Sequence, residues 1–121
     1  TNLLQKLEMN QNVHLCPPLS YIDTLSLMDS AKVVVTDSGG IQEETSALGV
    51  PCLTLRSNTE RPITINEGTN TLIANNWNLF RERIKGLSEQ CKKSENFIWD
   101  GKAGERILQK LESALCRSIL Q

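Results

Sequence analysis

The sequence has few histidines, few cysteines and no long apolar run, so it lacks the residues that metal sites and membrane helices need. Among its 121 residues there is one histidine, and the four cysteines stand far apart without a Cys-x-x-Cys pair. This makeup predicts no metal site and no cofactor. No apolar run approaches the roughly 20 residues of a membrane helix, and no signal-peptide pattern opens the chain. We therefore expect a soluble, cytoplasmic protein that does not bind a membrane.

Neither sign of charge is in excess, because 13 Lys and Arg residues stand against 14 Asp and Glu residues. A balanced surface does not attract a polyanion, so nucleic acid is not an expected partner. The length suits a single domain, which we assign to residues 1–121. The chain begins at Thr1 without an initiator methionine, which predicts a fragment of a longer protein.

The cysteines and the histidine have two interpretations each. Reduced, buried thiols are predicted rather than disulfides for Cys16, Cys52, Cys91 and Cys116. His14 lies in an apolar stretch, which is typical of a packed side chain. A catalytic role is the alternative, although no serine or cysteine partner identifies itself.

Strand patterns alternate with helix patterns, and no hairpin signal interrupts them, which is typical of a parallel α/β sheet. Strands are predicted at 13–16, 32–36, 51–55 and 71–74. Helices are predicted at 1–9, 21–30, 41–48, 77–88 and 103–120, with a helical turn at 62–66. Ser20 is expected to cap the second helix, and Gly49 to end the third.

Burial is predicted from the same patterns. The run 32–36 does not alternate, so we expect a buried strand. An apolar stripe at helical spacing predicts core packing for Trp77, Phe80, Ile84 and Leu87. An apolar loop under the domain is expected at 97–99. The wide apolar side of the helix at 103–120 suits docking on another part of a longer protein.

The turn between the strand at 32–36 and the helix at 41–48 is a candidate anion site. Ser38 offers a hydroxyl, while Gly39 and Gly40 allow a ligand close to the backbone. The first N–H groups of a helix have no internal partner and lie at its positive end. Two interpretations stay open here: a phosphate site, or a turn that lets the helix pack closely on the sheet.

Two carboxylates follow the turn. At 100° per residue, Glu43 is expected to face solvent, whereas Glu44 falls at the edge of the buried face. Glu44 is therefore the better candidate, with ribose hydroxyls as its expected partners. No G-x-G-x-x-G or Walker motif is present, which disfavours NAD and ATP.

The loop after the predicted strand at 51–55 is rich in polar groups, including Arg56, Glu60 and Arg61. Ligands bind at the carboxyl edge of open parallel sheets, where this loop begins. A ligand-facing loop and a solvated polar loop both fit these residues.

These motifs together resemble the UDP-N-acetylglucosamine 2-epimerase family of the non-hydrolysing type. The resemblance rests on T-D-S-G-G-I-Q-E-E at 36–44, L-G-V-P at 48–51, T-E-R-P at 59–62 and G-T at 68–69. It extends to P-P-L-S-Y at 17–21 and D-G-K-A-x-E-R-I at 100–107. Thr45 and Ser46 stand where the family often has a proline, and Thr24 where it often has an aromatic residue.

The resemblance implies the C-terminal half of a glycosyltransferase-B type fold, a Rossmann-like parallel sheet with flanking helices. It implies a UDP-sugar held between two domains. Carried over, Ser38, Gly39 and Gly40 bind the diphosphate, Glu44 binds the ribose, and Arg61 lies on the phosphate or sugar side. Leu19 and Thr24 match positions around the uracil.

The resemblance also implies a reaction, the interconversion of UDP-GlcNAc and UDP-ManNAc by elimination and re-addition of UDP, for cell-surface polysaccharide precursors. The family's acid and base lie mainly in the N-terminal domain, and its histidine lies upstream of this segment, so His14 does not inherit that role. The implied partners are the UDP-sugar, the N-terminal domain and a second copy of the parent. The alternatives are a hydrolysing relative, a glycosyltransferase of the same fold, or a non-catalytic domain that binds a partner or regulator.

Overall fold

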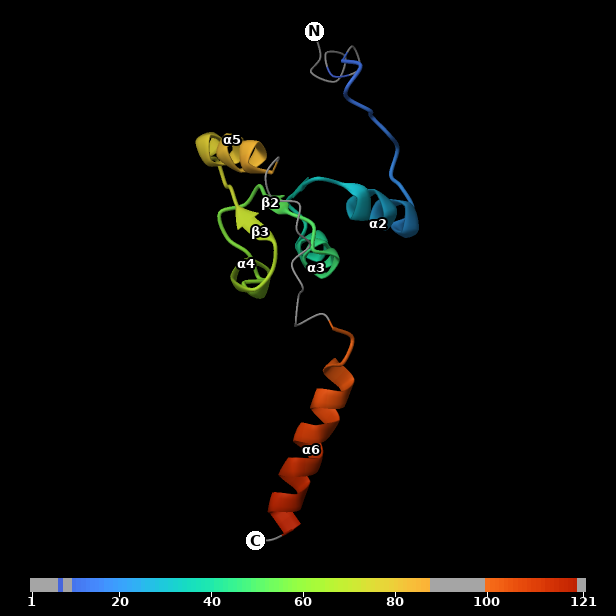
Figure 1. The fold of residues 1–121 in the computed structure, drawn as a ribbon, viewed down its shortest axis with the longest axis vertical. Helices are drawn as coiled ribbons and strands as arrows, with labels where there is room; N and C mark the ends of the chain where they lie inside the picture. The colour runs from blue at the N-terminus through green and yellow to red at the C-terminus, as the bar shows by residue number, and fades with distance from the viewer. Residues whose placement is uncertain (1–6, 8–9, 88–99, 120–121) are drawn as a thin grey trace.

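The computed structural model describes residues 7, 10–87 and 100–119 of the chain. Three strands and five helices alternate as expected of an α/β protein (Figure 1). In chain order they are α2 (Tyr21–Ser30), β1 (Val34–Thr36), α3 (Gly39–Leu48), β2 (Cys52–Thr54), α4 (Ile63–Asn66), β3 (Asn70–Leu72), α5 (Trp77–Gly86) and α6 (Ala103–Ile119). The predicted helix at 1–9 and the loop at 97–99 fall outside the described residues, apart from Leu7, which is helical.

The sheet is parallel throughout, which confirms the predicted sheet type. Its strand order is β1-β2-β3, with Val34 opposite Cys52 and Cys52 opposite Asn70. Every residue of β2 is buried, because this strand has a neighbour on each side. β1 lies at the edge, and its Val35 is 43% exposed, so the prediction of a fully buried first strand is wrong. Absence of alternation in 32–36 therefore did not indicate burial, because β1 lies at an edge of the described sheet.

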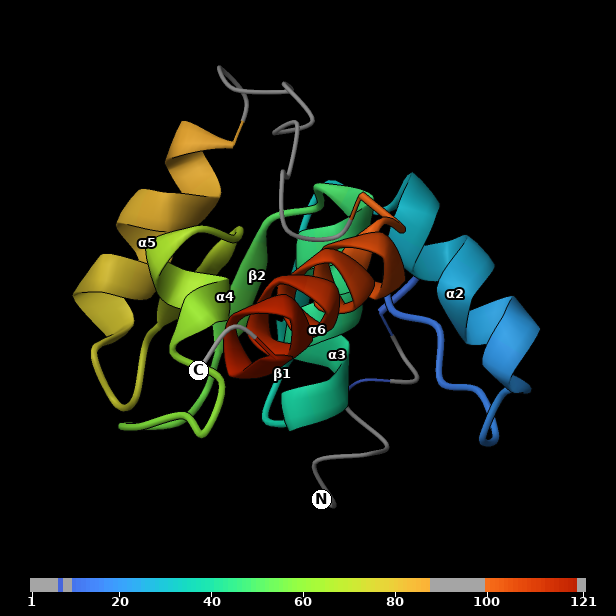
Figure 2. The same cartoon turned by 90° about the horizontal axis from the view of Figure 1, so that it is seen from below.

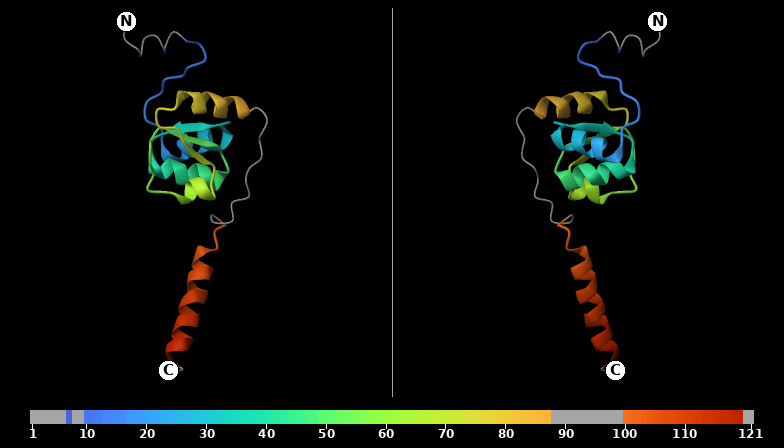
Figure 3. Two further views of the ribbon diagram at one scale, coloured as in Figure 1. Left: turned by 90° about the vertical axis from the view of Figure 1, so that its left-hand side faces the viewer. Right: turned by 90° about the vertical axis from the view of Figure 1, so that its right-hand side faces the viewer.

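Helices lie on both faces of the sheet. Views from either side place α3 and α4 on one face and α5 on the other (Figure 3). α2 packs beside α3, and α3 contacts all three strands. Since α3 follows the edge strand β1 and crosses to the strands beside it, its N-terminus lies at the carboxyl edge of the sheet.

Local capping fixes where the helices begin and end. Ser20 caps α2 as predicted, since its Oγ accepts a hydrogen bond from the N–H of Asp23 at 3.2 Å. Gly49 ends α3 as predicted, with a left-handed φ of 70° that favours glycine. The side chain of Asn76 caps α5 by accepting from the N–H of Leu79 at 3.0 Å.

The core between α3, α4 and the sheet contains many polar side chains. The buried apolar residues are Met28, Val50, Cys52, Leu53 and Ile73. The buried polar residues are Gln42, Thr45, Ser46, Thr54, Thr64 and Asn70. Hydrogen bonds to neighbours satisfy most of these polar groups, as burial requires.

The predicted core packing of the apolar stripe at Trp77, Phe80, Ile84 and Leu87 is wrong, since Phe80 and Leu87 are only half-buried and Leu87 lies just past the end of α5. Trp77 is 54% exposed and Ile84 is 38% exposed, and α5 has no buried residue. Trp77 instead packs edge-on against Phe80, with ring centroids 5.8 Å apart. In the part of the chain that the structure describes, nothing covers the outer side of this helix.

The predicted strand at 13–16 is also wrong. These residues form no strand, and His14, Leu15 and Cys16 are exposed. A strand needs a neighbouring ladder, and the described sheet ends at β1 and β3. The prediction that His14 is packed is therefore wrong as well.

The cysteines are free thiols where the structure describes them. Cys52 is fully buried, and burial raises the pKa of its thiol. Cys16 and Cys116 are exposed, so the prediction of buried thiols is wrong for these two. Cys91 lies outside the described residues.

α6 extends away from the sheet (Figure 1), so in the view from below it lies foreshortened in front of the other elements (Figure 2). Its start is fixed by Asp100, whose carboxylate accepts two hydrogen bonds from Arg106 Nη1, at 2.7 and 3.0 Å. Its apolar residues remain exposed: Ile107, Leu108, Leu111 and Leu115. Across the described residues, no helix combines the length and the hydropathy that crossing a bilayer would require.

Candidate functional site

The candidate site begins at the turn between β1 and α3. Ser38 takes an extended conformation at the N-cap, with φ −83° and ψ 129°, and its side chain makes no capping hydrogen bond. Its own N–H donates to Thr36 Oγ1 at 3.0 Å, which fixes the turn. The first turn of α3 carries no acidic residue. No side chain of the helix itself therefore competes with an anion for the N–H groups at this end.

Gly39 and Gly40 are the first two residues of α3, which begins two residues earlier than predicted, and they have different surroundings. A Cβ atom on Gly39 would lie 2.5 Å from Glu60 Oε1, too close for a real contact. A Cβ on Gly40 would meet only Ser38 Oγ, at 3.9 Å. The Glu60 carboxylate, the end of a flexible side chain, lies close over Gly39, while the backbone at Gly40 is open. Neither glycine lies against the sheet, so the open backbone at Gly40 favours ligand access over close packing of the helix on the sheet.

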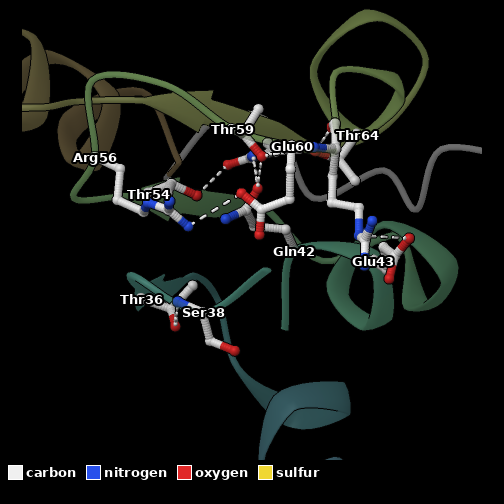
Figure 4. Close-up of polar contacts among 11 residues, drawn as sticks. Thr36, Ser38, Gln42, Glu43, Thr54, Arg56, Thr59, Glu60 and Thr64 are labelled. Atoms are coloured by element: carbon white, nitrogen blue, oxygen red, sulfur yellow. Dashed lines mark hydrogen bonds and ion pairs between the residues drawn. The ribbon is translucent and has the colours of Figure 1, made fainter. Parts of the chain in front are cut away.

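The loop between β2 and α4 meets this turn, as the contact of Glu60 with Gly39 shows. Two arginines of the loop form ion pairs with carboxylates (Figure 4). Arg56 Nη1 lies 3.2 Å from Glu60 Oε2, and Arg61 Nε lies 3.1 Å from Glu43 Oε1. Both pairs are partly exposed, so each contributes little to stability. The arginines are therefore available to an anionic ligand at small cost.

The groups around Glu60 lower the pKa of its carboxyl. A hydrogen bond from its own backbone, followed by the positive charge of Arg56, lowers the pKa of the Glu60 carboxyl below its ordinary value. A negative charge consequently stands beside the positive end of α3 at neutral pH. It shares that position with two guanidinium groups, from Arg56 and Arg61.

Of the two carboxylates of α3, Glu43 differs from its predicted placement and Glu44 lies as expected. Glu43 was expected to face solvent, but its side chain is 41% exposed and binds Arg61. Glu44 is half-buried on the same helix, near the expected edge position. Its role toward a ribose stays a prediction. Helical periodicity predicts the direction in which each side chain leaves α3. It cannot predict that the loop between β2 and α4 brings Arg61 against Glu43.

Leu19 and Thr24 lie at the N-terminal end of α2. Leu19 is 40% exposed, just before the capping Ser20. The hydroxyl of Thr24 donates to the carbonyl oxygen of Ser20 at 2.9 Å, within its own helix. α2 packs beside α3, so both residues belong to the same half of the molecule as the turn. Contact of either residue with a uracil stays a prediction.

A buried set of polar side chains beneath the loop was missed by the sequence analysis. Its central member is Gln42, which is fully buried one turn into α3. Its Oε1 accepts hydrogen bonds from Thr59 Oγ1 at 2.6 Å and from Asn70 Nδ2 at 3.1 Å. The signal was present, because Gln42 and Thr59 both fall inside the motifs that were singled out. No cluster of three or more His, Cys, Asp or Glu side chains suited to a metal occurs among the described residues.

Comparisons with known proteins show the family of the chain. The sequence model of UDP-N-acetylglucosamine 2-epimerase matches residues 1–112. The chain belongs to this family. Its curated relatives include the UDP-N-acetylglucosamine 2-epimerase of Methanocaldococcus jannaschii, 39% identical over 110 residues, and that of Campylobacter jejuni, 39% identical over 106 residues. These matches cover 91% and 83% of this chain but only 30% and 28% of the relatives.

Solved structures of family members show the same fold. The M. jannaschii UDP-GlcNAc 2-epimerase superposes with a TM-score of 0.76 at 38% identity, over 92% of this chain and 31% of that one. A structure of the Neisseria meningitidis UDP-GlcNAc 2-epimerase bound to UDP-GlcNAc superposes with a TM-score of 0.73 at 34% identity, over 90% and 31%. The predicted Rossmann-like parallel sheet with flanking helices, of the glycosyltransferase-B type, is confirmed. The chain spans about a third of the length of these epimerases.

Proposed function

We propose that this chain is the UDP-binding, C-terminal domain of a non-hydrolysing UDP-N-acetylglucosamine 2-epimerase. The whole enzyme would interconvert UDP-GlcNAc and UDP-ManNAc by eliminating UDP and adding it back, for cell-surface polysaccharide precursors. Family membership supports the reaction class. A solved relative in complex with UDP-GlcNAc and UDP supports the ligand.

One observation carries the proposal: the N-terminus of α3 and the loop with Arg56 and Arg61 meet at the carboxyl edge of the sheet. The unpaired N–H groups of α3 supply donors along the helix axis. The guanidinium groups supply positive charge and paired donors from the side. A diphosphate is the ligand whose charge and oxygen atoms match both sources.

Each residue then has a chemical role. Ser38, Gly39 and Gly40 donate to the diphosphate, with Gly40 giving the closest backbone access. Glu44, one turn along α3, accepts hydrogen bonds from the ribose hydroxyls. Arg61 binds on the phosphate or sugar side and exchanges its contact with Glu43 for one with the ligand. Stabilising UDP in this way makes it a better leaving group in the elimination step.

Leu19 and Thr24 complete the proposed site on the uracil side. Leu19 offers exposed apolar surface to the base. The hydroxyl of Thr24 is occupied within α2, so its methyl group and backbone are what it can offer. Base recognition here would depend on apolar contact rather than on stacking.

The proton-transferring groups belong to the N-terminal domain in this proposal, and the parent enzyme is a homodimer. The chain alone would bind UDP but would not turn over substrate. An assay of the full-length protein distinguishes two branches of the family, because release of free ManNAc indicates hydrolysis and equilibration of the two UDP-sugars indicates epimerisation.

Calorimetric titration of UDP into the chain tests the binding role. The double variant Glu44→Ala, Arg61→Ala should weaken UDP binding at least about tenfold, since each lost charge-assisted hydrogen bond costs on the order of 1.5–3 kcal/mol. The matched control Glu67→Ala, Arg83→Ala removes the same charges from exposed positions just after α4 and on α5. If wild type and the first double variant behave identically at millimolar UDP, the proposal is wrong.

A further inference from the structure

The backbone of Arg61 is held by hydrogen bonds on both sides. Its N–H donates to Thr59 Oγ1 at 3.0 Å. Its carbonyl oxygen accepts from Thr64 Oγ1 at 2.7 Å. Arg61 is exposed to solvent, yet its backbone makes hydrogen bonds through both its N–H and its carbonyl group. The position of its Cα atom is set by two neighbouring hydroxyl groups.

Those two hydroxyl groups are held in turn by buried amides. Thr59 Oγ1 donates to Gln42 Oε1 at 2.6 Å, and Asn70 Nδ2 donates both to Thr64 Oγ1 and to Gln42 Oε1, at 3.1 Å each. Thr54 Oγ1 donates to Asn70 Oδ1 at 2.6 Å. We call these five residues the Gln42 network. It connects α3, β2 and β3 to the loop that carries Arg61 (Figure 4).

Each group of the network has a partner of the opposite kind. Thr54 gives its proton to Asn70 Oδ1, and the Asn70 amide presents its N–H groups to Gln42 and Thr64. Gln42 turns Oε1 toward Asn70 and Thr59. Rotating the Gln42 amide alone would place N–H groups opposite each other. The two hydroxyl groups that hold the Arg61 backbone are thus both bonded to buried amides.

The Gln42 network lowers the stability of the fold at one atom. Gln42 Nε2 is buried and, among the described residues, has no hydrogen-bond partner. An unsatisfied buried donor destabilises a fold, and apolar side chains of similar volume would avoid the penalty. A polar network in this place therefore fits a need for a defined position more than a need for stability.

We propose that Gln42 and Thr59 are positioning residues that set where Arg61 stands relative to the turn at Ser38. This inference rests on the proposed UDP site. α3 holds the loop twice, through Gln42 in the interior and through Glu43 at the surface. The surface contact can be exchanged for a ligand, while the buried one keeps the Arg61 backbone in place.

The substitution Thr59→Val tests the inference, because it keeps the shape of the side chain and removes the hydroxyl. UDP binding, measured by calorimetry, should weaken about tenfold, the effect of losing one well-placed hydrogen bond. Thr59→Ser keeps the hydroxyl and should restore most of the affinity. Thr71→Val, a matched change on β3, should leave affinity within about twofold of wild type.

A double-mutant cycle separates positioning from general destabilisation. If Thr59 acts through Arg61, Thr59→Val should have little effect on UDP affinity in an Arg61→Ala background. A full tenfold loss in that background would overturn the inference. Hydrogen exchange gives a second measurement: the Arg61 amide should exchange at least about tenfold faster in Thr59→Val and unchanged in Thr59→Ser. Equal exchange in wild type and Thr59→Val would also overturn it.

The outcomes distinguish this inference from the proposed function. If wild type binds UDP and Thr59→Val binds it equally well, only the positioning role fails. If wild type does not bind UDP at all, the proposed function fails, and this use of Arg61 fails with it.

Discussion

At the scale of single residues, Glu60 places a negative charge beside a turn that is suited to an anion. Its Oε1 lies against Gly39, and its Oε2 pairs with Arg56. We expect Glu60→Gln to tighten UDP binding about threefold to tenfold, because the variant removes repulsion and releases Arg56. Calorimetry at neutral pH measures the change.

Two comparisons control this prediction. Glu67→Gln makes the same charge change at the end of α4 and should leave UDP affinity unchanged. The gain from Glu60→Gln should be full above the ordinary carboxyl pKa and should vanish as the pH falls through the lowered pKa of Glu60, where the wild-type residue becomes neutral. Weaker binding by Glu60→Gln would instead show that the carboxylate accepts a hydrogen bond from the ligand.

Gly68 and Gly86 form a pair with opposite expected effects on stability. A Cβ at Gly68 would collide with the Thr64 backbone oxygen and with Ser46 Oγ, whereas a Cβ at Gly86 meets nothing within 4 Å. Gly68→Ala should therefore lower the free energy of unfolding by about 1–3 kcal/mol. Gly86→Ala should raise it by up to about 1 kcal/mol, since alanine favours the helix. Urea denaturation measures both, and equal effects would contradict the predicted collision.

Single residues also show what the sequence could predict about the site. Ser38, Gly39, Gly40 and Arg61 were identified from motifs, and the structure brings their two segments together. Gln42 was missed, and Glu43 was expected only to face solvent, because their partners come from a loop that is distant in sequence. Helical periodicity describes one element at a time. It carries no information about what returns to pack over that element.

At the scale of elements, α2 and α3 both have serine at the N-cap, but only one of the two serines makes a capping hydrogen bond. Ser20 caps α2 through its side chain, while Ser38 makes no capping bond for α3. We expect Ser20→Ala to lower the free energy of unfolding by about 1 kcal/mol. Ser38→Ala should change stability by much less but should weaken UDP binding. Thermal denaturation and UDP titration of both variants check this, and a stability loss for Ser38→Ala equal to that for Ser20→Ala would contradict it.

Element types were predicted better than their burial. α2 has its predicted bounds, and the sheet is parallel as expected. The strand predicted at 71–74 begins one residue earlier, at Asn70, and its pairing continues past β3 through Ile73 N–H to the carbonyl oxygen of Thr54 at 2.8 Å. Burial failed where it depends on neighbours: Val35 lies in an edge strand, and Trp77 lies on the uncovered side of α5. An apolar pattern shows which face of an element is suited to burial, but it does not show whether another element packs against that face.

At the scale of the whole molecule, the chain exposes more surface than a compact domain of its size. Its accessible surface is 9653 Å², against roughly 6,500 Å² for a compact monomer of this length. The apolar side of α6 is part of the excess, with Leu115 63% exposed. We expect a urea m-value near the low end of the usual range, about 1 kcal/mol/M, because less surface becomes exposed on unfolding. A value near about 2 kcal/mol/M would indicate that α6 packs against something in solution.

The polar core has a consequence for how stability changes with temperature. Unfolding exposes amides and hydroxyl groups, such as those of Gln42, Thr54 and Asn70, together with few large apolar side chains. Hydration of apolar surface raises the heat capacity, whereas hydration of polar surface lowers it. The heat-capacity change should therefore fall below the usual 12–15 cal/mol/K per residue, about 1.5–1.8 kcal/mol/K for this length. Scanning calorimetry should show that the free energy of unfolding changes little with temperature. The hydrogen bonds that position Arg61 should then be retained to a similar extent in cold and warm conditions.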